Sequence, residues 1–178
     1  MRDENAVAYR PHFTRFRLAE VTDLDLESLF NLAGAFALLG WLLLIVSPWW
    51  RPGTNLIVPV IIPLVLTVMY AVLFAIGITE VKGSFNSLAG VRALFASDRL
   101  LLAGWIHYLA FDLFIGSWEV RDARRLGIPH LLVVPCLICT LMLGPVGLAM
   151  YFALRAGARR TLWIDDVSPI ATEPAPGG

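Results

Sequence analysis

Residues 100–118 have the sequence LLLAGWIHYLAFDLFIGSW, which is apolar over a length sufficient to cross a lipid bilayer. Two ionisable side chains, His107 and Asp112, interrupt this stretch. A charged side chain at the centre of a membrane helix costs roughly 2.5–3.5 kcal/mol on insertion scales, so it needs a partner, water or neutralisation. We therefore predict a membrane helix whose two ionisable residues are candidates for a functional site.

The composition of the whole chain is that of an integral membrane protein. Of its 178 residues, 58% are hydrophobic and 16% are charged, and the mean hydropathy is +0.72. A soluble domain contains about 25% charged residues. The formal net charge is zero, so the composition does not favour an anionic partner. We predict that the chain is surrounded by membrane lipid and has no nucleic-acid partner.

Four segments are long and apolar enough to be membrane helices, and they cover residues 29–46, 56–78, 100–118 and 131–154. The sequence therefore predicts an all-α integral membrane protein, with a four-transmembrane-helix bundle in residues 28–157. Residues 1–27 are predicted to form an N-terminal tail at the membrane interface, and residues 158–178 a polar, partly disordered C-terminal tail. A kink is expected near Pro145, because proline removes a backbone donor.

The charges and tryptophans of the chain predict its orientation in the membrane. An even number of spans would place both termini on one side, and most Lys and Arg residues would lie on that side. The positive-inside rule then predicts that both termini are cytoplasmic. Indole rings prefer the membrane interface, and the six tryptophans lie mostly near predicted span ends, so an anchoring belt is expected from Trp41, Trp49, Trp50, Trp105, Trp118 and Trp163.

The ionisable residues of the third span lie on different sides of the predicted helix. At 100° per residue, a stripe contains Asp112 and Glu119, together with Trp105 and Tyr108, whereas His107 projects about 140° away from Asp112. Two groups that flank a cleft can still act as acid and base on one ligand. The alternatives are a neutral His107 bonded to a carbonyl, a packing role for Tyr108, and a solvated Glu119 that caps the span.

Other chemical motifs in the sequence are weak. His107, Asp112 and His130 lack the close ligand spacing of a metal site, so we predict no metal. Cys136 and Cys139 lie in an apolar segment and are expected to pack rather than form a redox pair. The long connection before the third span is expected to contain an interfacial helix, at residues 88–95, that covers the bundle mouth.

The third and fourth spans resemble a known family. FASDRLLLAGWIHYLAFDLF (95–114), then Asp122 in the predicted loop, then CTLMLGPVGLAMYF (139–152) resembles the abscisic-acid-deficiency-four-like family of small membrane proteins. The most specific element is Trp-Ile-His, four residues, then Asp-Leu-Phe, at 105–107 and 112–114. Pro145 with Gly147 is a second, less specific match.

This resemblance implies carotenoid chemistry. Plant members of the family are associated with the formation of neoxanthin from violaxanthin, in which an epoxide is isomerised to an allenic alcohol without a redox cofactor. The resemblance makes His107 and Asp112 the candidates for the acid and the base. The candidate substrate-binding residues are Trp105, Tyr108, Phe111, Phe114 and Pro145. The plant pattern is apolar at the positions of Tyr108 and Glu119, so neither is expected to be essential.

The expected function is therefore a membrane-embedded, cofactor-independent isomerase of a carotenoid or a related isoprenoid. No plastid transit peptide is evident, which favours a bacterial-type relative in the cytoplasmic membrane. A homodimer or a carotenoid-pathway enzyme is a further possible partner. The alternative is a non-catalytic pigment-binding, lipid-binding or scaffold protein in which His107 and Asp112 hydrogen-bond between helices. A small transporter fits less well, because four spans without a repeat leave little room for alternating access.

Overall fold

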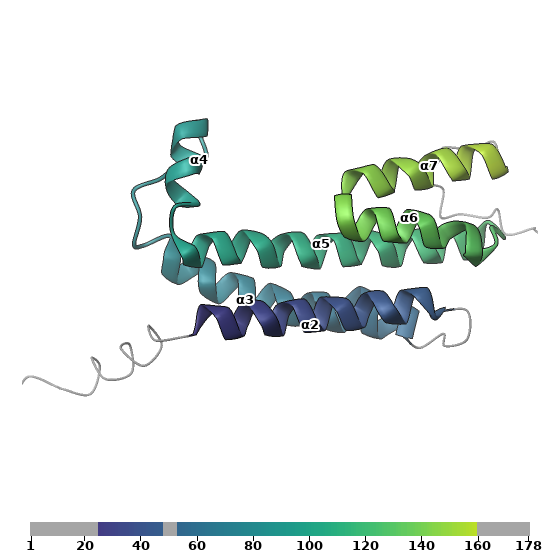
Figure 1. Ribbon diagram of the computed structural model, residues 1–178, viewed down its shortest axis with the longest axis horizontal. Helices are drawn as coiled ribbons and strands as arrows, with labels where there is room; N and C mark the ends of the chain where they lie inside the picture. Colours follow the sequence, from purple (N-terminus) through teal and green to yellow (C-terminus); the bar gives the residue numbers. More distant parts are fainter. Residues whose placement is uncertain (1–24, 48–52, 160–178) are drawn as a thin grey trace, which may run out of the picture. The chain divides into compact units, whose positions relative to one another are not determined.

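The computed structural model of the protein describes residues 25–47 and 53–159. All regular elements in these two ranges are helical, which confirms the all-α prediction (Figure 1). They are α2 (Leu26–Ile45), the π-helix η2 (Gly53–Ile61), α3 (Ile62–Gly77), α4 (Leu88–Leu94), α5 (Asp98–Arg125), α6 (His130–Leu143) and α7 (Pro145–Arg159). Most of the two predicted tails lies outside the described residues, as do Trp49, Trp50 and Trp163.

Three described helices are long and apolar enough to cross a membrane: Leu26–Ile45, Asn55–Gly77 and Asp98–Arg125. These lengths and compositions support the prediction of a membrane protein. The four-transmembrane-helix bundle is not confirmed, because the fourth predicted span, at 131–154, consists of two shorter helices. The cytoplasmic position of the termini, which rested on four spans, stays a prediction.

The fourth predicted span is broken at Gly144. This residue has φ 50° and ψ −101°, on the left-handed side of backbone space that glycine tolerates best. Pro145 follows and begins α7, a position where the missing backbone N–H costs no helical hydrogen bond. α6 and α7 pack against each other after the break (Figure 1). The kink expected near Pro145 is therefore a reversal of the chain.

α2 begins three residues before the start of the first predicted span. Asp25 precedes the helix and accepts hydrogen bonds from the Ser28 hydroxyl and, at 3.2 Å, from the Glu27 N–H. The hydrogen bond from Ser28, and to a smaller extent the bond from Glu27, lowers the pKa of the Asp25 carboxyl below its usual value. An aspartate that satisfies the first free N–H groups stabilises a helix start, so α2 begins at Leu26.

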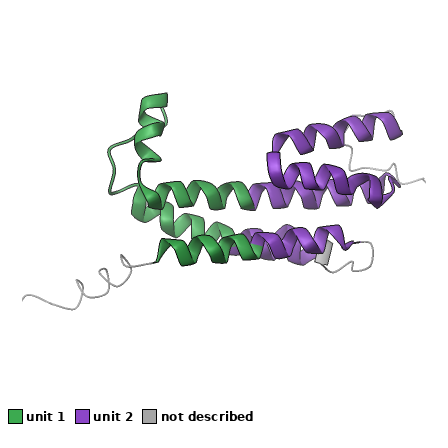
Figure 2. Cartoon of the chain, viewed as in Figure 1, with its two compact units in different colours: residues 1–36, 66–109 green, residues 37–65, 110–178 purple. Residues whose placement is uncertain are grey.

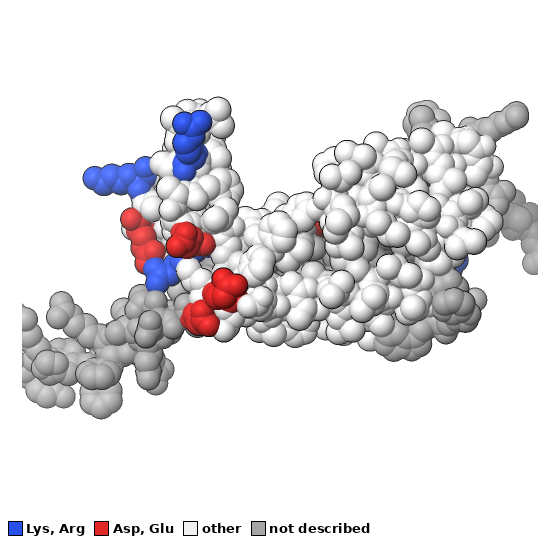
Figure 3. Space-filling model, in the orientation of Figure 1, with Lys and Arg blue, Asp and Glu red and all other residues white. Residues whose placement is uncertain are grey.

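The chain divides into two compact units (Figure 2). Unit 1 contains residues 1–36 and 66–109, and unit 2 contains residues 37–65 and 110–178. In unit 1, Lys, Arg, Asp and Glu side chains gather around α4 and the starts of α2 and α5, whereas the visible sides of the helices are almost free of charge (Figure 3). Uncharged helix sides are what a lipid environment requires.

Trp41 packs inside unit 2, contrary to its predicted position at the membrane interface. Its side chain is only 1% exposed. A β-carbon added at Gly116 would lie 2.7 Å from the Trp41 ring, so the ring packs directly over this glycine. The prediction failed for this residue because a glycine on another helix provides room for a large ring, and hydropathy does not report such a pairing.

Gly147 of α7 also lies close to another helix, and this contact allows the packing of α6 against α7 to be tested. A β-carbon at Gly147 would lie 2.0 Å from the Thr140 backbone nitrogen, which cannot move aside as a side chain can. We expect Gly147→Ala to lower the free energy of unfolding by at least about 1–3 kcal/mol. Thermal unfolding of the purified protein in detergent, followed by circular dichroism, measures the effect.

The matched control is Gly157→Ala on the same helix. An added β-carbon there meets no atom within 4 Å, so alanine should leave the stability unchanged or raise it by up to about 1 kcal/mol. Equal unfolding temperatures for the two variants would show that α6 and α7 are not packed at Gly147.

Candidate functional site

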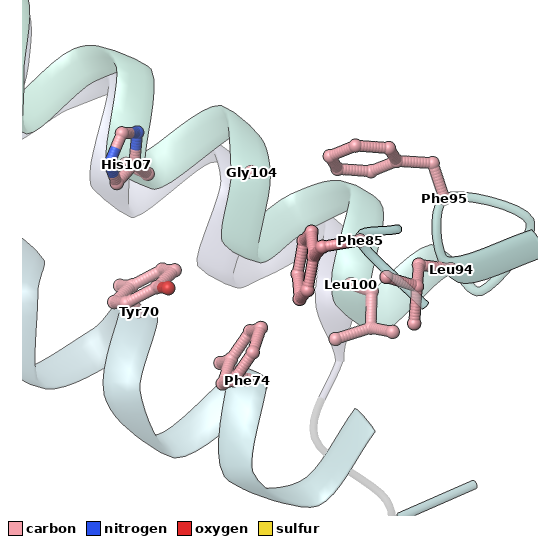
Figure 4. A pocket seen from close by; sticks show the side chains of 8 residues that line it. All are labelled: Tyr70, Phe74, Phe85, Leu94, Phe95, Leu100, Gly104 and His107. Carbon is pink, nitrogen blue, oxygen red and sulfur yellow. The ribbon is translucent and has the colours of Figure 1, made fainter. Parts of the chain in front are cut away.

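Unit 1 contains an apolar pocket with a volume of about 240 Å³ (Figure 4). Its walls come from α3, from the connection that follows it, from α4 and from α5. The lining residues are Tyr70, Phe74, Phe85, Leu94, Phe95, Leu100, Gly104 and His107. An apolar cavity with few polar groups is the usual form of a small-molecule site.

Helical spacing explains why two of the walls exist. Tyr70 and Phe74 are four residues apart on α3, and Leu100 and Gly104 have the same spacing on α5, so each pair lies on one helix face. Gly104 leaves room for a neighbouring ring, because a β-carbon there would lie 2.6 Å from Cε1 of Phe95. The pocket therefore depends on the absence of a side chain at Gly104.

The connection from α3 to α5 is held at both ends. Glu80, just after α3, forms an ion pair with Arg99 in the first turn of α5. Between them, Ser87 caps α4 by accepting a hydrogen bond from the Gly90 N–H at 3.0 Å. These contacts position the aromatic wall of the pocket. α4 confirms the helix predicted at residues 88–95, and its position at the membrane interface stays a prediction.

Besides the Tyr70 hydroxyl, the polar group in the lining of this pocket is His107. Its ring lies opposite that of Tyr70 (Figure 4), with the ring centroids 5.7 Å apart and the planes inclined by 55°. Tyr70 in turn stacks on Phe74 at 5.6 Å. Histidine is the one residue type in the lining that takes up or releases a proton near neutral pH. The pocket thus combines apolar walls with two side chains that can transfer a proton, the His107 imidazole and the Tyr70 hydroxyl.

Asp112 is not among the residues that line the His107 pocket. It is half-buried, and it lies near enough to Glu119, two turns further along α5, for their charges to interact. The structure therefore does not bring the two predicted catalytic residues together in this pocket. The catalytic assignment of His107 and Asp112 stays a prediction.

The five predicted substrate-binding residues lie elsewhere. Trp105 is 42% exposed and stacks on Phe30, and it lines a separate hollow with Glu27 and Asp98. Tyr108 is half-buried beside Trp105, with ring centroids 5.4 Å apart. The other three residues, Phe111, Phe114 and Pro145, are exposed, as Trp105 is. None of the five lines the His107 pocket, and their role in substrate binding stays a prediction.

Unit 2 contains a buried polar cluster around Asp122 that the sequence did not reveal. Asp122 Oδ2 accepts hydrogen bonds from the Tyr151 hydroxyl at 2.7 Å and from Arg155 Nε at 2.8 Å. Oδ1 accepts from a terminal nitrogen of Arg125 at 2.9 Å. We expected Asp122 in a loop, but α5 continues to Arg125 and carries the residue into the core. The pairing with Arg155 and Tyr151 explains this burial.

Glu119 is also buried, contrary to the expectation that it is a solvated cap. The residue is 0% exposed, and its Oε1 accepts a hydrogen bond from Thr140 Oγ1 at 3.0 Å. Within residues 25–47 and 53–159, Oε2 has no hydrogen-bond partner. Its neighbour Trp118 packs edge-on against Tyr151, which explains why this turn faces inward.

The other residues that the sequence singled out, His130, Cys136 and Cys139, lie on α6. His130 begins α6, and its Nε2 hydrogen-bonds the Ile45 carbonyl at 2.9 Å. Cys136 and Cys139 on α6 are free thiols, the first of them buried. Among the described residues, no group of three or more His, Cys, Asp or Glu residues has the arrangement of a metal site.

The fold and the pocket are those of a small helical membrane protein with an apolar cavity. The family model described as ABA DEFICIENT 4-like matches residues 28–151, which is more than half of the chain. The protein therefore belongs to the ABA DEFICIENT 4-like family. Neither the curated proteins nor the solved structures include a match to the chain.

Proposed function

We propose that the protein binds a carotenoid or a related isoprenoid within the membrane and isomerises it at the His107 pocket. The observation that carries this proposal is an aromatic, apolar pocket that has a histidine, His107, in its lining. Membership of the ABA DEFICIENT 4-like family supports the choice of a carotenoid as substrate class.

The size of the pocket limits how such a substrate would bind. A carotenoid is about as long as a bilayer is thick, roughly 30 Å, and a volume of about 240 Å³ is too small for the whole molecule. We infer that one cyclic end group enters the pocket, against Phe74 and Phe85. The polyene would lie outside, along exposed apolar side chains of α3 such as Val68 and Val72.

The proposed reaction needs two proton transfers and no change in composition. A base removes a proton from the polyene carbon next to the epoxide, a C=C bond forms and the adjacent C–O bond breaks. An acid then supplies a proton to the oxygen, which becomes a hydroxyl group. We propose His107 for one transfer and Asp112 for the other, in either order. No redox cofactor enters this balance.

The experiment that tests this function uses the full chain in a host that accumulates violaxanthin and other epoxy-xanthophylls. Extracted pigments are compared by chromatography and mass spectrometry with those of the host alone and of an Asp112→Asn variant. We expect a new pigment of unchanged mass that is strongly reduced in the variant. Unchanged pigments despite full-length protein in the membrane would contradict the proposed activity.

The second candidate function is that of a non-catalytic pigment- or lipid-binding protein. It is favoured by the absence of Asp112 from the lining of the pocket, which leaves the proposed pair of His107 and Asp112 incomplete there. A binding protein should copurify with pigment that is chemically unchanged. An isomerase should copurify with, or release, the isomer.

A further inference from the structure

We propose that the last turns of α5 form a binding site for a phosphate group, supplied by the headgroup of an anionic phospholipid. Three arginines lie within five residues of each other at this end: Arg121, Arg124 and Arg125. Together with Asn55 of η2 they line one open hollow of about 430 Å³ in unit 2. This site is separate from the His107 pocket and is independent of the proposed carotenoid chemistry.

The last turns of α5 carry three positive charges and one carboxylate between residues 121 and 125. All three arginines are exposed. The only acidic residue among them in sequence is Asp122, and its carboxylate already binds the buried Arg155 and Tyr151 in addition to Arg125. Arg121 has no hydrogen bond or ion pair to any residue that the structure describes. An anion from outside the protein would therefore meet an excess of positive charge.

The length of α5 places this end at the depth of lipid phosphates. A helix of 28 residues is about 42 Å long, which matches a bilayer with its headgroups rather than its hydrocarbon core alone. A span of this helix through the core would leave the arginines in the headgroup layer. The occupant that this depth favours is a phospholipid.

Arginine also has the right shape for this ligand. Its planar guanidinium donates two parallel hydrogen bonds to a phosphate, and charge-assisted bonds of this kind are strong. Asn55 adds an amide donor from a different element. Arginines that only anchor a helix end by reaching toward water would attract any anionic surface and would not need to share a hollow. The experiment must therefore distinguish binding of a lipid headgroup in this hollow from a general attraction of arginines to anionic lipid.

Binding is measured on the full-length protein in mild detergent by native mass spectrometry. The probes are phosphatidylglycerol, which is anionic, and phosphatidylcholine, which is not. An arginine that contacts the lipid phosphate directly is expected to change the binding of that lipid by about fivefold. We expect Arg121→Gln to weaken phosphatidylglycerol binding about fivefold, and Arg121→Gln with Arg124→Gln to weaken it about 25-fold. Phosphatidylcholine binding should not change.

The matched control is Arg92→Gln, which removes an exposed arginine of α4 in unit 1. This variant should bind phosphatidylglycerol like the unchanged protein. An equal loss in the control, or no loss in either site variant, would overturn the proposal. Arg124 also contacts the Ser47 carbonyl at 3.5 Å, so Arg121→Gln decides the outcome if the double variant does not fold.

Inorganic pyrophosphate distinguishes a lipid from a soluble source of phosphate. We expect it not to change the unfolding temperature. Stabilisation by pyrophosphate that disappears in Arg121→Gln, with phosphatidylglycerol binding equal in both proteins, would retain a phosphate site but overturn the headgroup as its ligand.

Discussion

Asp122→Ala is expected to lower the free energy of unfolding by about 3–5 kcal/mol. The substitution removes the acceptor of the Tyr151 hydroxyl and of Arg155 Nε, at 2.7 Å and 2.8 Å. Arg155 is 0% exposed, so its guanidinium would remain buried without its counter-charge. The loss should appear as a low yield of folded protein from membranes and as a lower unfolding temperature in detergent.

The matched control for this variant is Glu80→Ala. Glu80 also pairs with an arginine, Arg99, but the two side chains are 40% and 22% exposed. Exposed ion pairs contribute about 0–1 kcal/mol, so Glu80→Ala should change stability by less than about 1 kcal/mol. Losses of equal size in the two variants would contradict the structural role of the buried cluster.

A double variant separates the cost of the unpaired charge from the loss of packing. Asp122→Leu with Arg155→Met removes both charges and retains apolar volume. Replacing both partners of a buried ion pair is often neutral, whereas removing one partner is not. The double variant should therefore be more stable than Asp122→Ala. If it is not, the hydrogen bonds to Tyr151 and Arg125 contribute more than the charge balance.

The buried cluster also shows why the sequence predicted the start of α5 better than its end. Hydropathy predicted a helix through Trp118, and the next turns, with Arg121 and Asp122, have the composition of a loop. The helix continues because Asp122 pairs with residues 29 and 33 positions later in the chain. Contacts at such separations leave no local pattern, so neither this extension nor the burial of Glu119 could be predicted.

The break in the fourth predicted span was visible in the sequence, but its consequence was not. Gly144 followed by Pro145 predicts an interruption of a helix. Whether the halves continue with a kink or fold back depends on how they pack afterwards. Here Gly147 of α7 approaches the backbone of Thr140 on α6, a contact that only the paired helices create.

Only part of the candidate site was predicted from the sequence, because some of its walls depend on contacts between distant residues. The cost of an ionisable group in an apolar span identified His107, and the structure places this residue in a pocket. The walls formed by Phe85 and Leu94 could not be predicted, because they come from the connection and from α4. Helical periodicity alone predicted that His107 and Asp112 project from different sides of the helix. The absence of Asp112 from the pocket lining agrees with this prediction.

His107→Phe is expected to lower the conversion of an epoxy-xanthophyll by about 10²- to 10⁴-fold, the range that a general acid or base contributes. Phenylalanine keeps an aromatic ring against Tyr70, whose centroid lies 5.7 Å from that of His107, but it removes both ring nitrogens. The ratio of product to substrate pigment, normalised to the amount of protein in the membrane, measures the effect.

The control is His130→Gln. His130 hydrogen-bonds the Ile45 carbonyl and does not line the pocket, and a glutamine amide can donate the same bond. Conversion by His130→Gln should equal that of the unchanged protein. Full conversion by His107→Phe would contradict a catalytic role for the histidine. Pigment that copurifies with His107→Phe without being converted would show that the pocket binds substrate and that His107 transfers the proton. Loss of both pigment and conversion, at normal protein levels, would assign His107 to binding instead.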